Sequence, residues 1–195
     1  MRITYNAPFV LTYTLVCLVI TSIDFLLLNN LVITQNFFTV YPFGTAPMSL
    51  TNPLAYWRLF SHALGHADFN HLLGNFTFIL LLGPILEEKY GSDKLLWMSF
   101  LTAFITGILN ASLFSSALLG ASGIVFMMIL LASFTNMRAG TIPLTFLLIA
   151  GLFLGKEIYN TMFVENNTSE FAHILGGISG AVFGYIFGIR PKETA

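Results

Sequence analysis

Residues 115 to 134 read SSALLGASGIVFMMILLASF, and they set a serine between two glycines at the head of an apolar run. The run has the character of a helix that lies in lipid, since a membrane-spanning helix needs about 20 predominantly apolar residues. Ser122 stands between Gly120 and Gly123 at the start of this helix. A polar side chain inside a spanning segment is costly, so Ser122 is a candidate functional residue.

The whole chain has the composition of an integral membrane protein. It has 195 residues, 56% of them hydrophobic, with only eight Lys or Arg and nine Asp or Glu. A water-soluble domain of this composition would lack polar surface to cover itself. We therefore expect an all-α membrane protein, a single domain over residues 1–195 without linkers or an appended soluble domain. Six transmembrane helices are expected, over residues 8–28, 70–86, 95–113, 119–136, 142–160 and 171–189.

The positions of the basic residues predict the orientation. Cytoplasmic loops of membrane proteins are enriched in Lys and Arg. With the N-terminus inside, only Arg58 and Lys156 fall outside, so both termini are expected in the cytoplasm. Residues 30–69 then form a long first extracytoplasmic loop of about 40 residues, in which residues 52–64 have enough apolar side chains to lie in the membrane interface. The basic residues expected inside are Arg2, Lys89, Lys94, Arg138, Arg190 and Lys192.

Several classes of protein are excluded. The formal net charge of −1 gives no basic patch for nucleic acid. The single cysteine, Cys17, lies inside the first expected span, so no disulfide framework or CxxC site is available and we expect it to pack. The α/β-hydrolase elbow GxSxG is excluded, because GASGI lacks its last glycine. No cofactor is expected.

Polar residues from three separate segments are expected at one depth. In this orientation the second, fourth and sixth spans all begin at the outer face. His71 and Asn75 lie near the start of the second, Ser122 near that of the fourth and His173 near that of the sixth. At a rise of about 1.5 Å per residue, each lies within roughly 10 Å of the outer end of its helix.

These residue types suit nucleophilic catalysis. A serine hydroxyl becomes a good nucleophile when a base, usually histidine at neutral pH, takes its proton. His71 and Asn75 share one helix face and can donate hydrogen bonds to a developing oxyanion, together with backbone N–H groups at Ser122. The flanking glycines then allow backbone or substrate to approach the serine.

Each residue alone has a simpler structural explanation. A serine in a membrane helix is most often an interhelical hydrogen bonder, and a lone histidine or asparagine is most often a packed side chain. A zinc site is a third interpretation, but His66 and His71 are about 140° apart around a helix, so no metal is expected. Asp68 is interpreted as a helix cap and His62 as a loop residue.

The sixth expected span carries four glycines at four-residue spacing. Such a small-xxx-small pattern lets two helices approach closely in lipid. His173 precedes the first of these glycines by three residues, so it lies on about the same face. The helix that packs on these glycines is therefore expected to meet the histidine. The glycines are Gly176, Gly180, Gly184 and Gly188.

Five short motifs resemble those of the rhomboid family of intramembrane serine proteases, over residues 57 to 184. They are WR, HxxxxHxxxN in HADFNHLLGN, ExxxGS in EEKYGS, GxSG in GASG, and AHxxGxxxG in AHILGGISG. Each alone is weak, and their order and spacing together are highly specific. Their residues are Trp57, Arg58, His66, His71, Asn75, Glu87, Gly91, Gly120, Ser122, Gly123, His173, Gly176 and Gly180.

The resemblance implies a six-helix core with a Ser122–His173 dyad in a water-accessible cavity, and an oxyanion hole of His71, Asn75 and backbone N–H groups. It implies transmembrane protein substrates, cut near their outer end after a small residue, in a bacterial inner (plasma) membrane. One departure is Phe126, where the family often has a tyrosine that stacks on the histidine. The alternative is a catalytically silent member that binds or routes membrane clients.

The fifth span is the expected gate for a substrate. Lys156 and Glu157 shorten its apolar length, so its outer end should pack least firmly. With residues 161–170 it is the expected moving element that admits a substrate helix sideways.

Overall fold

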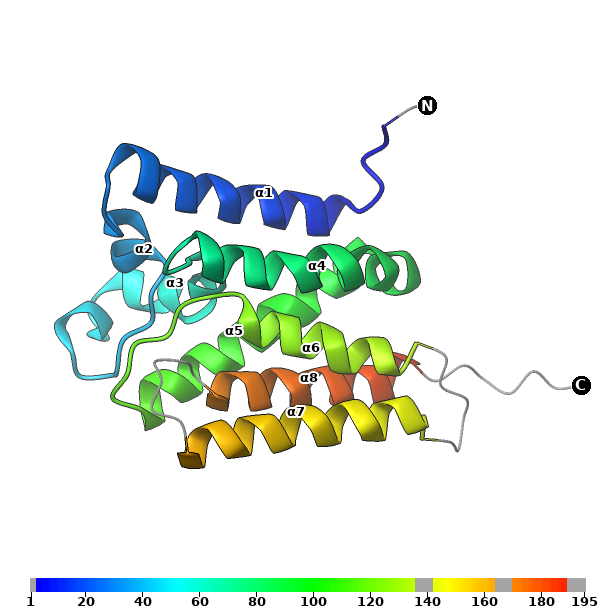
Figure 1. Ribbon diagram of the computed structural model, residues 1–195. Coiled ribbons are helices and arrows are strands. Elements are labelled where there is room, and N and C mark those ends of the chain that lie inside the picture. Colours follow the sequence, from blue (N-terminus) through cyan, green and yellow to red (C-terminus); the bar gives the residue numbers. More distant parts are fainter. Residues whose placement is uncertain (1–2, 136–141, 164–169, 189–195) are drawn as a thin grey trace, which may run out of the picture.

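The computed structural model describes residues 3–135, 142–163 and 170–188, and within these ranges the protein is a bundle of helices (Figure 1). Its main helices follow the ranges expected from the apolar runs. They are α1 (Pro8–Ser22), extended by the π-helix η1 (Ile23–Leu27), α4 (Phe69–Tyr90), α5 (Ser92–Leu113), α6 (Ser122–Ser133), α7 (Leu144–Phe163) and α8 (Glu170–Gly188).

Four stretches of the described chain are long and apolar enough to cross a membrane. They are Pro8–Leu27, Phe69–Tyr90, Ser92–Leu113 and Glu170–Phe187. The apolar helix α6 has 12 residues, which is short for a span. The count of six transmembrane helices therefore stays a prediction, as does the extent of the domain. Four basic residues behind the predicted orientation, Arg2, Arg138, Arg190 and Lys192, lie outside the described residues.

Successive main helices alternate in direction, so α4, α6 and α8 all begin at the same end of the bundle (Figure 1). The link between α4 and α5 is the single residue Gly91, whose φ of 85° suits a glycine. At this link Glu87 accepts hydrogen bonds from the N–H groups of Phe9 and Val10 and from the hydroxyl of Ser92. One buried carboxylate therefore joins the start of α1 to the end of α4.

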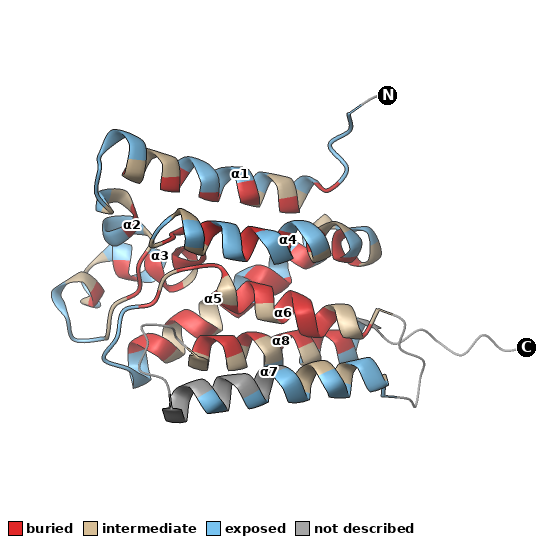
Figure 2. Ribbon diagram, viewed as in Figure 1, coloured by how far each residue is buried: buried red, intermediate tan, exposed pale blue. Residues whose placement is uncertain are grey.

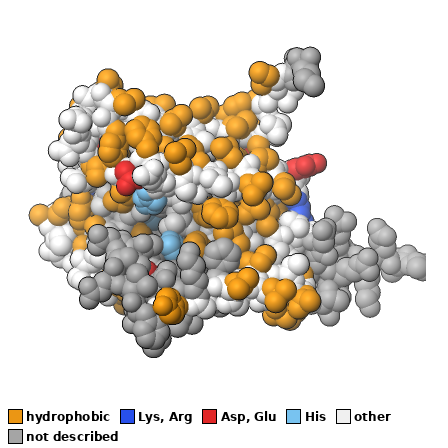
Figure 3. Space-filling view, in the orientation of Figure 1, with side chains coloured by type: hydrophobic (Ala, Val, Ile, Leu, Met, Phe, Trp, Pro, Cys, Tyr) orange, Lys and Arg blue, Asp and Glu red, His pale blue; other side chains and the backbone are white. Residues whose placement is uncertain are grey.

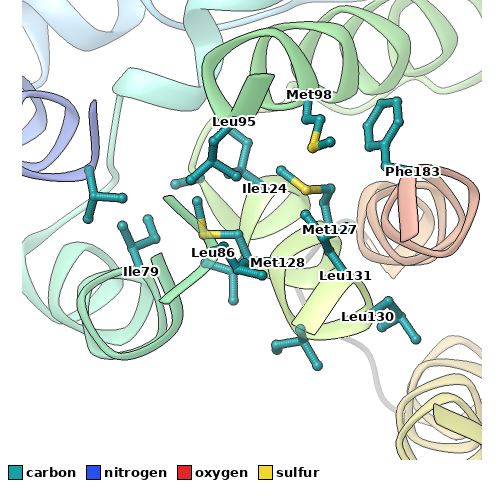
Figure 4. Packing of buried hydrophobic residues seen from close by; sticks show 14 of the residues in the cluster. Ile79, Leu86, Leu95, Met98, Ile124, Met127, Met128, Leu130, Leu131 and Phe183 are labelled. Atoms are coloured by element: carbon teal, nitrogen blue, oxygen red, sulfur yellow. The ribbon is translucent and has the colours of Figure 1, made fainter. Parts of the chain in front are cut away.

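Helix α6 lies at the centre of the bundle, and most of its residues are buried (Figure 2). Its apolar side chains pack against those of the surrounding helices (Figure 4). On α8, a Cβ added at Gly176 or Gly180 would overlap a backbone carbonyl of α6. The close approach predicted from the glycine spacing is thus confirmed, and the partner helix is α6. The labelled core residues include Ile79, Leu86, Leu95, Ile124, Met127, Met128, Leu131 and Phe183.

The segment expected as a long first loop contains short helices. They are α2 (Val32–Phe37), η2 (Ala46–Met48), α3 (Pro53–Ser61) and η3 (His62–Leu64). The buried Asp24 accepts hydrogen bonds from the N–H groups of Ile33 and Thr34, and Arg58 donates to the carbonyl groups of Asn36 and Pro47. The segment is therefore held by hydrogen bonds to its own backbone.

The end of the fifth span also differs from the expected boundary. Helix α7 continues to Phe163, so the first residues of the expected loop 161–170 are helical. Residues 164–169 of that loop lie outside the described residues, and so do the side chains of Lys156 and Glu157.

Candidate active site

A cavity of about 580 Å³ opens between α4, α6 and α8 at the end where these helices begin. Its volume falls in the range of about 300–1,000 Å³ that is usual for ligand pockets. Figure 3 shows histidine side chains in the hollow on this face. The structure thus brings together the four residues expected at one depth. The lining residues are Ala67, Asp68, His71, Gly74, Asn75, Ala117, Leu118, Leu119, Ser122 and His173.

Ser122 is the first residue of α6, and the extended chain before it is fixed by the first loop. Leu118 and Val40 exchange two backbone hydrogen bonds of 2.9 Å, and the Gly120 N–H donates to the carbonyl of His62 at 2.9 Å. The first N–H groups of a helix have no acceptor within the helix. These hydrogen bonds therefore hold the backbone before Ser122 in place, and the first N–H groups of α6 are available to donate hydrogen bonds at the cavity.

His173 lies in the second turn of α8 and is 8% exposed. Its ring stacks on Phe126 of α6, with centroids 4.3 Å apart and planes 5° from parallel. The expectation that a phenylalanine at this position still stacks on the histidine is confirmed. Gly176, one turn further along α8, lies against the carbonyl of Gly123, the residue after Ser122. The serine and the histidine are thus carried by two helices in backbone contact.

His71 faces the same cavity from the first turn of α4. The side chain of Asp68 caps this helix by accepting from the His71 N–H at 2.7 Å, which confirms the predicted cap. The Ala67 N–H donates to His71 Nδ1 at 3.5 Å, so a neutral ring carries its proton on Nε2. A Cβ on Gly120, whose φ is 112°, would lie 2.6 Å from His71 Nε2. The glycine before the serine thus leaves room for this ring.

Asn75 lies one turn after His71 and is 6% exposed. Its amide nitrogen is buried and has no hydrogen-bond partner among the described residues. A buried donor without a partner is costly, so such a group calls for an explanation. The position of Asn75 in the cavity lining supplies one, because a ligand oxygen there can accept its hydrogen bond.

Two further histidines lie behind the cavity. His66 is fully buried, and its ring meets His71 edge-on with centroids 5.2 Å apart. Burial lowers the pKa of His66 to about 3 and that of His62 to about 4. His62, expected as a loop residue, is instead buried in η3 with Nε2 3.0 Å from the Ala103 carbonyl. The His62 carbonyl also holds the segment before Ser122, because it accepts the hydrogen bond from the Gly120 N–H. The local sequence does not indicate this long-range contact.

The remaining motif residues lie away from the cavity lining. Trp57 packs edge-to-face on Phe60, and Arg58 binds carbonyls of the first loop. Glu87 and Gly91 lie at the opposite end of α4. Gly180 packs against α6 one turn beyond Gly176. In the described part of the chain, no group of three or more His, Cys, Asp or Glu is placed to hold a metal ion.

Sequence reasoning misses one residue of the cavity lining. The sequence predicts Asp68 only as a cap, and in the structure it also lines the cavity. The signal was its position three residues before His71, which places it at the same end of α4 as the polar residues.

Together, the apolar helices and the polar cavity at one end of the bundle define a helical membrane protein with an internal polar site. The model of the Rhomboid domain family matches residues 53–190. The chain is 31% identical over 136 residues to the Rhomboid protease GlpG of Haemophilus influenzae, covering 67% of this chain and 69% of that protein. The protein therefore belongs to the rhomboid family, and it is a multi-pass integral membrane protein.

Two eukaryotic relatives extend this comparison. RHOMBOID-like protein 1 of Arabidopsis thaliana is 31% identical over an alignment of 147 residues, which covers 70% of this chain and 36% of the relative. Rhomboid-related protein 2 of Mus musculus is 30% identical over an alignment of 158 residues, which covers 70% of this chain and 52% of the relative. The chain spans about a third and about half of the length of these two proteins.

Proposed function

We propose that this protein is an intramembrane serine endopeptidase that cleaves transmembrane substrates near their extracytoplasmic end. The observation that carries the proposal is a single cavity lined by Ser122, His173, His71 and Asn75. The relative named Rhomboid protease GlpG supports the same reaction class. Ser122 and His173 are proposed as the catalytic dyad.

In the proposed reaction, Ser122 Oγ attacks the carbonyl carbon of the scissile peptide bond, and its proton passes to an imidazole nitrogen of His173. The tetrahedral intermediate collapses as His173 returns the proton to the leaving amine, and the substrate's carbonyl carbon remains esterified to Ser122. Water, deprotonated by His173, then attacks the ester carbonyl, and His173 returns the proton to Ser122 Oγ as the ester bond breaks. Stacking on Phe126 limits the orientations of the imidazole, which supports this role.

The oxyanion of the intermediate requires donors that are in place before the reaction. We assign this role to the Nε2–H of His71, the amide N–H of Asn75 and the backbone N–H of Ser122. The Asn75 amide supports the assignment best, because its nitrogen is buried and free of partners among the described residues. A donor that gains its hydrogen bond only with bound substrate favours the transition state over the free enzyme.

The proposed substrate is a transmembrane helix that unwinds locally after a small residue. A helix shields its carbonyl groups by hydrogen bonds, so the protease must receive an extended segment. The packing of α7 supports lateral entry of the substrate helix between α4 and α7. Within the described ranges α7 packs on α6 and α8, whereas α4 and α7 share no extensive contact. A helix arriving there would reach the cavity without parting α6 from α8.

The proposed location is a bacterial inner membrane with both termini in the cytoplasm. Single cysteines placed at residues 45–52 in a Cys17→Ala background should react with an impermeant reagent only from outside, and cysteines at residues 88–93 only from inside. Labelling of residues 45–52 from the cytoplasm would invert this orientation.

The dyad is tested by cleavage of transmembrane peptides by purified protein in detergent. Ser122→Ala and His173→Ala should each reduce cleavage to background, and the double variant should be no worse than either, because the two groups act as a unit. Substantial cleavage by Ser122→Ala would refute the dyad. Peptide binding without cleavage by the wild-type protein would instead support the silent, client-binding alternative.

A further inference from the structure

We propose that Asp68 makes the cavity selective for substrates with a basic side chain near the scissile bond and against substrates with an acidic one there. This inference rests on the proposed function and adds a substrate class to it. The observation is that Asp68 lines the same cavity as Ser122 and His173. Figure 3 shows an acidic side chain beside the histidines in this hollow.

No Lys or Arg offsets the charge of Asp68 among the described residues of the cavity lining. Of the ten described residues that line the cavity, Asp68 is the one acidic residue, and none of these ten is Lys or Arg. The others are small or apolar side chains apart from His71, Asn75, Ser122 and His173. A charge beside low-dielectric walls acts over a longer range than the same charge in open water. A cationic substrate side chain is therefore attracted and an anionic one repelled.

The contacts of Asp68 leave part of its carboxylate available. Oδ1 accepts from the His71 N–H at 2.7 Å, which caps α4 and fixes the side chain at the cavity edge. No hydrogen bond to Oδ2 is present among the described residues, and the residue is exposed. A carboxylate anchored through one oxygen can accept a hydrogen bond from Lys or Arg through the other.

The cap and the charge can be separated by substitution. Asn caps helices about as well as Asp, so Asp68→Asn keeps the start of α4 and removes the charge. The matched control is Glu88→Gln, which removes the same charge from an exposed residue of the same helix, at its far end. Both variants change the net charge of the protein equally, so only the position of the lost charge differs.

The test uses one cleavable transmembrane peptide in which Lys, Gln or Glu is placed in turn at each position flanking the scissile bond. The measured quantity is the ratio of kcat/KM for the Lys peptide to that for the Glu peptide. At the position nearest Asp68 we expect a ratio of about ten in the wild-type protein, falling with added salt, since each exposed charge contact contributes up to a few-fold. The ratio should approach one in Asp68→Asn and stay unchanged in Glu88→Gln.

Because both kcat/KM values in the ratio are measured on the same variant, a general loss of activity in Asp68→Asn cancels. Cleavage with equal ratios in wild type and Asp68→Asn at every position overturns this inference and leaves the proposed function intact. If the wild-type protein cleaves no peptide, the proposed function fails, and binding of the same peptides decides the inference. Tighter binding of Lys than of Glu peptides by the wild type but not by Asp68→Asn supports it, and equal affinities overturn it.

Discussion

Two helices that flank α6 carry glycines at four-residue spacing and use them differently. On α8 the glycines lie against α6, where an added Cβ would meet backbone or an aromatic ring. On α7, a Cβ added at Gly151 or Gly155 would meet no atom within 4 Å among the described residues. The α8 glycines concerned are Gly176, Gly180 and Gly184.

The comparison shows that glycine spacing alone does not identify a helix contact. The α6–α8 contact carries both Ser122 and His173, so its close packing serves the fixed geometry of the proposed dyad. The α7 side exposes Leu144, Leu148 and Leu152. We infer that the molecule has one fixed side, formed by α6 and α8, and one loosely packed side at α7 that suits substrate entry.

The strongest test of this comparison is to cross-link α7 to α4, so that the loosely packed side can no longer open. Cysteines at Asn70 on α4 and Tyr159 on α7, in a Cys17→Ala background, can be joined by a bis-maleimide linker with a reducible bond. If a substrate helix enters between these helices, cross-linking should reduce peptide cleavage to background, and reduction should restore it. Each single-cysteine protein treated in the same way is the control. Full activity in protein shown to be cross-linked would contradict entry at this side.

A second test asks whether the start of α4 belongs to the fixed side. If Asn75 is held in place as an oxyanion donor, Asn75→Ala should lower kcat by about 10²–10³, or roughly 2.7–4 kcal/mol, with little change in substrate binding. If Asn75 is only a packing amide, stability should fall by about 0.6 kcal/mol, the average for a hydrogen bond in a membrane protein. Measuring kcat and thermal stability on one preparation separates the two results.

A third test concerns the first loop, which holds the serine segment through His62. Burial lowers the pKa of His62 from 6.5 to about 4. Between these values the unfolded chain binds a proton that the folded protein does not, so the free energy of unfolding falls as the pH falls from 6.5 to 4. The loss reaches about 3 kcal/mol, and above pH 6.5 this contribution is constant.

Thermal unfolding in detergent across this pH range provides the measurement. The pKa of His66 is also lowered by burial, to about 3, so His62→Gln should remove about half of the pH dependence that these two histidines contribute between pH 6.5 and 4. The same slope in wild type and His62→Gln would mean that His62 is not buried as a neutral ring.

The smallest effects come from the glycines themselves, and they compare the two sides directly. Gly176→Ala places a methyl group against the Gly123 carbonyl and should cost about 1–3 kcal/mol of stability, as overpacking does. Gly151→Ala meets open space and should change stability by less than about 1 kcal/mol, in the favourable direction because alanine is the better helix former. Equal melting temperatures for the two variants would contradict the distinction between fixed and loose sides.

Much of this arrangement follows from local sequence. Apolar runs predict the positions of the long helices, and the four-residue spacing of Gly176 and Gly180 predicts a close helix contact. The short distance of His71, Ser122 and His173 from their helix starts predicts that they meet. These features depend on periodicity and helix length, which a single sequence contains.

Other features depend on contacts between residues far apart in the chain. Leu118 pairs with Val40, and the carbonyl of His62 accepts from Gly120, yet nothing near these residues in the sequence indicates the pairing. Gly151 and Gly176 have the same local spacing and different surroundings. Such differences are set by tertiary packing, so they required the structure.

The shortness of α6 has a consequence for where a substrate would be cut. Twelve residues make a helix of about 18 Å, against a hydrocarbon core of about 30 Å. With its inner end level with the inner edge of that core, α6 would place Ser122 about 12 Å below the outer edge, the length of about eight helical residues. The thickness of the host bilayer would then set the depth of Ser122 below the outer edge, and a thicker membrane would shift cleavage deeper into the substrate helix.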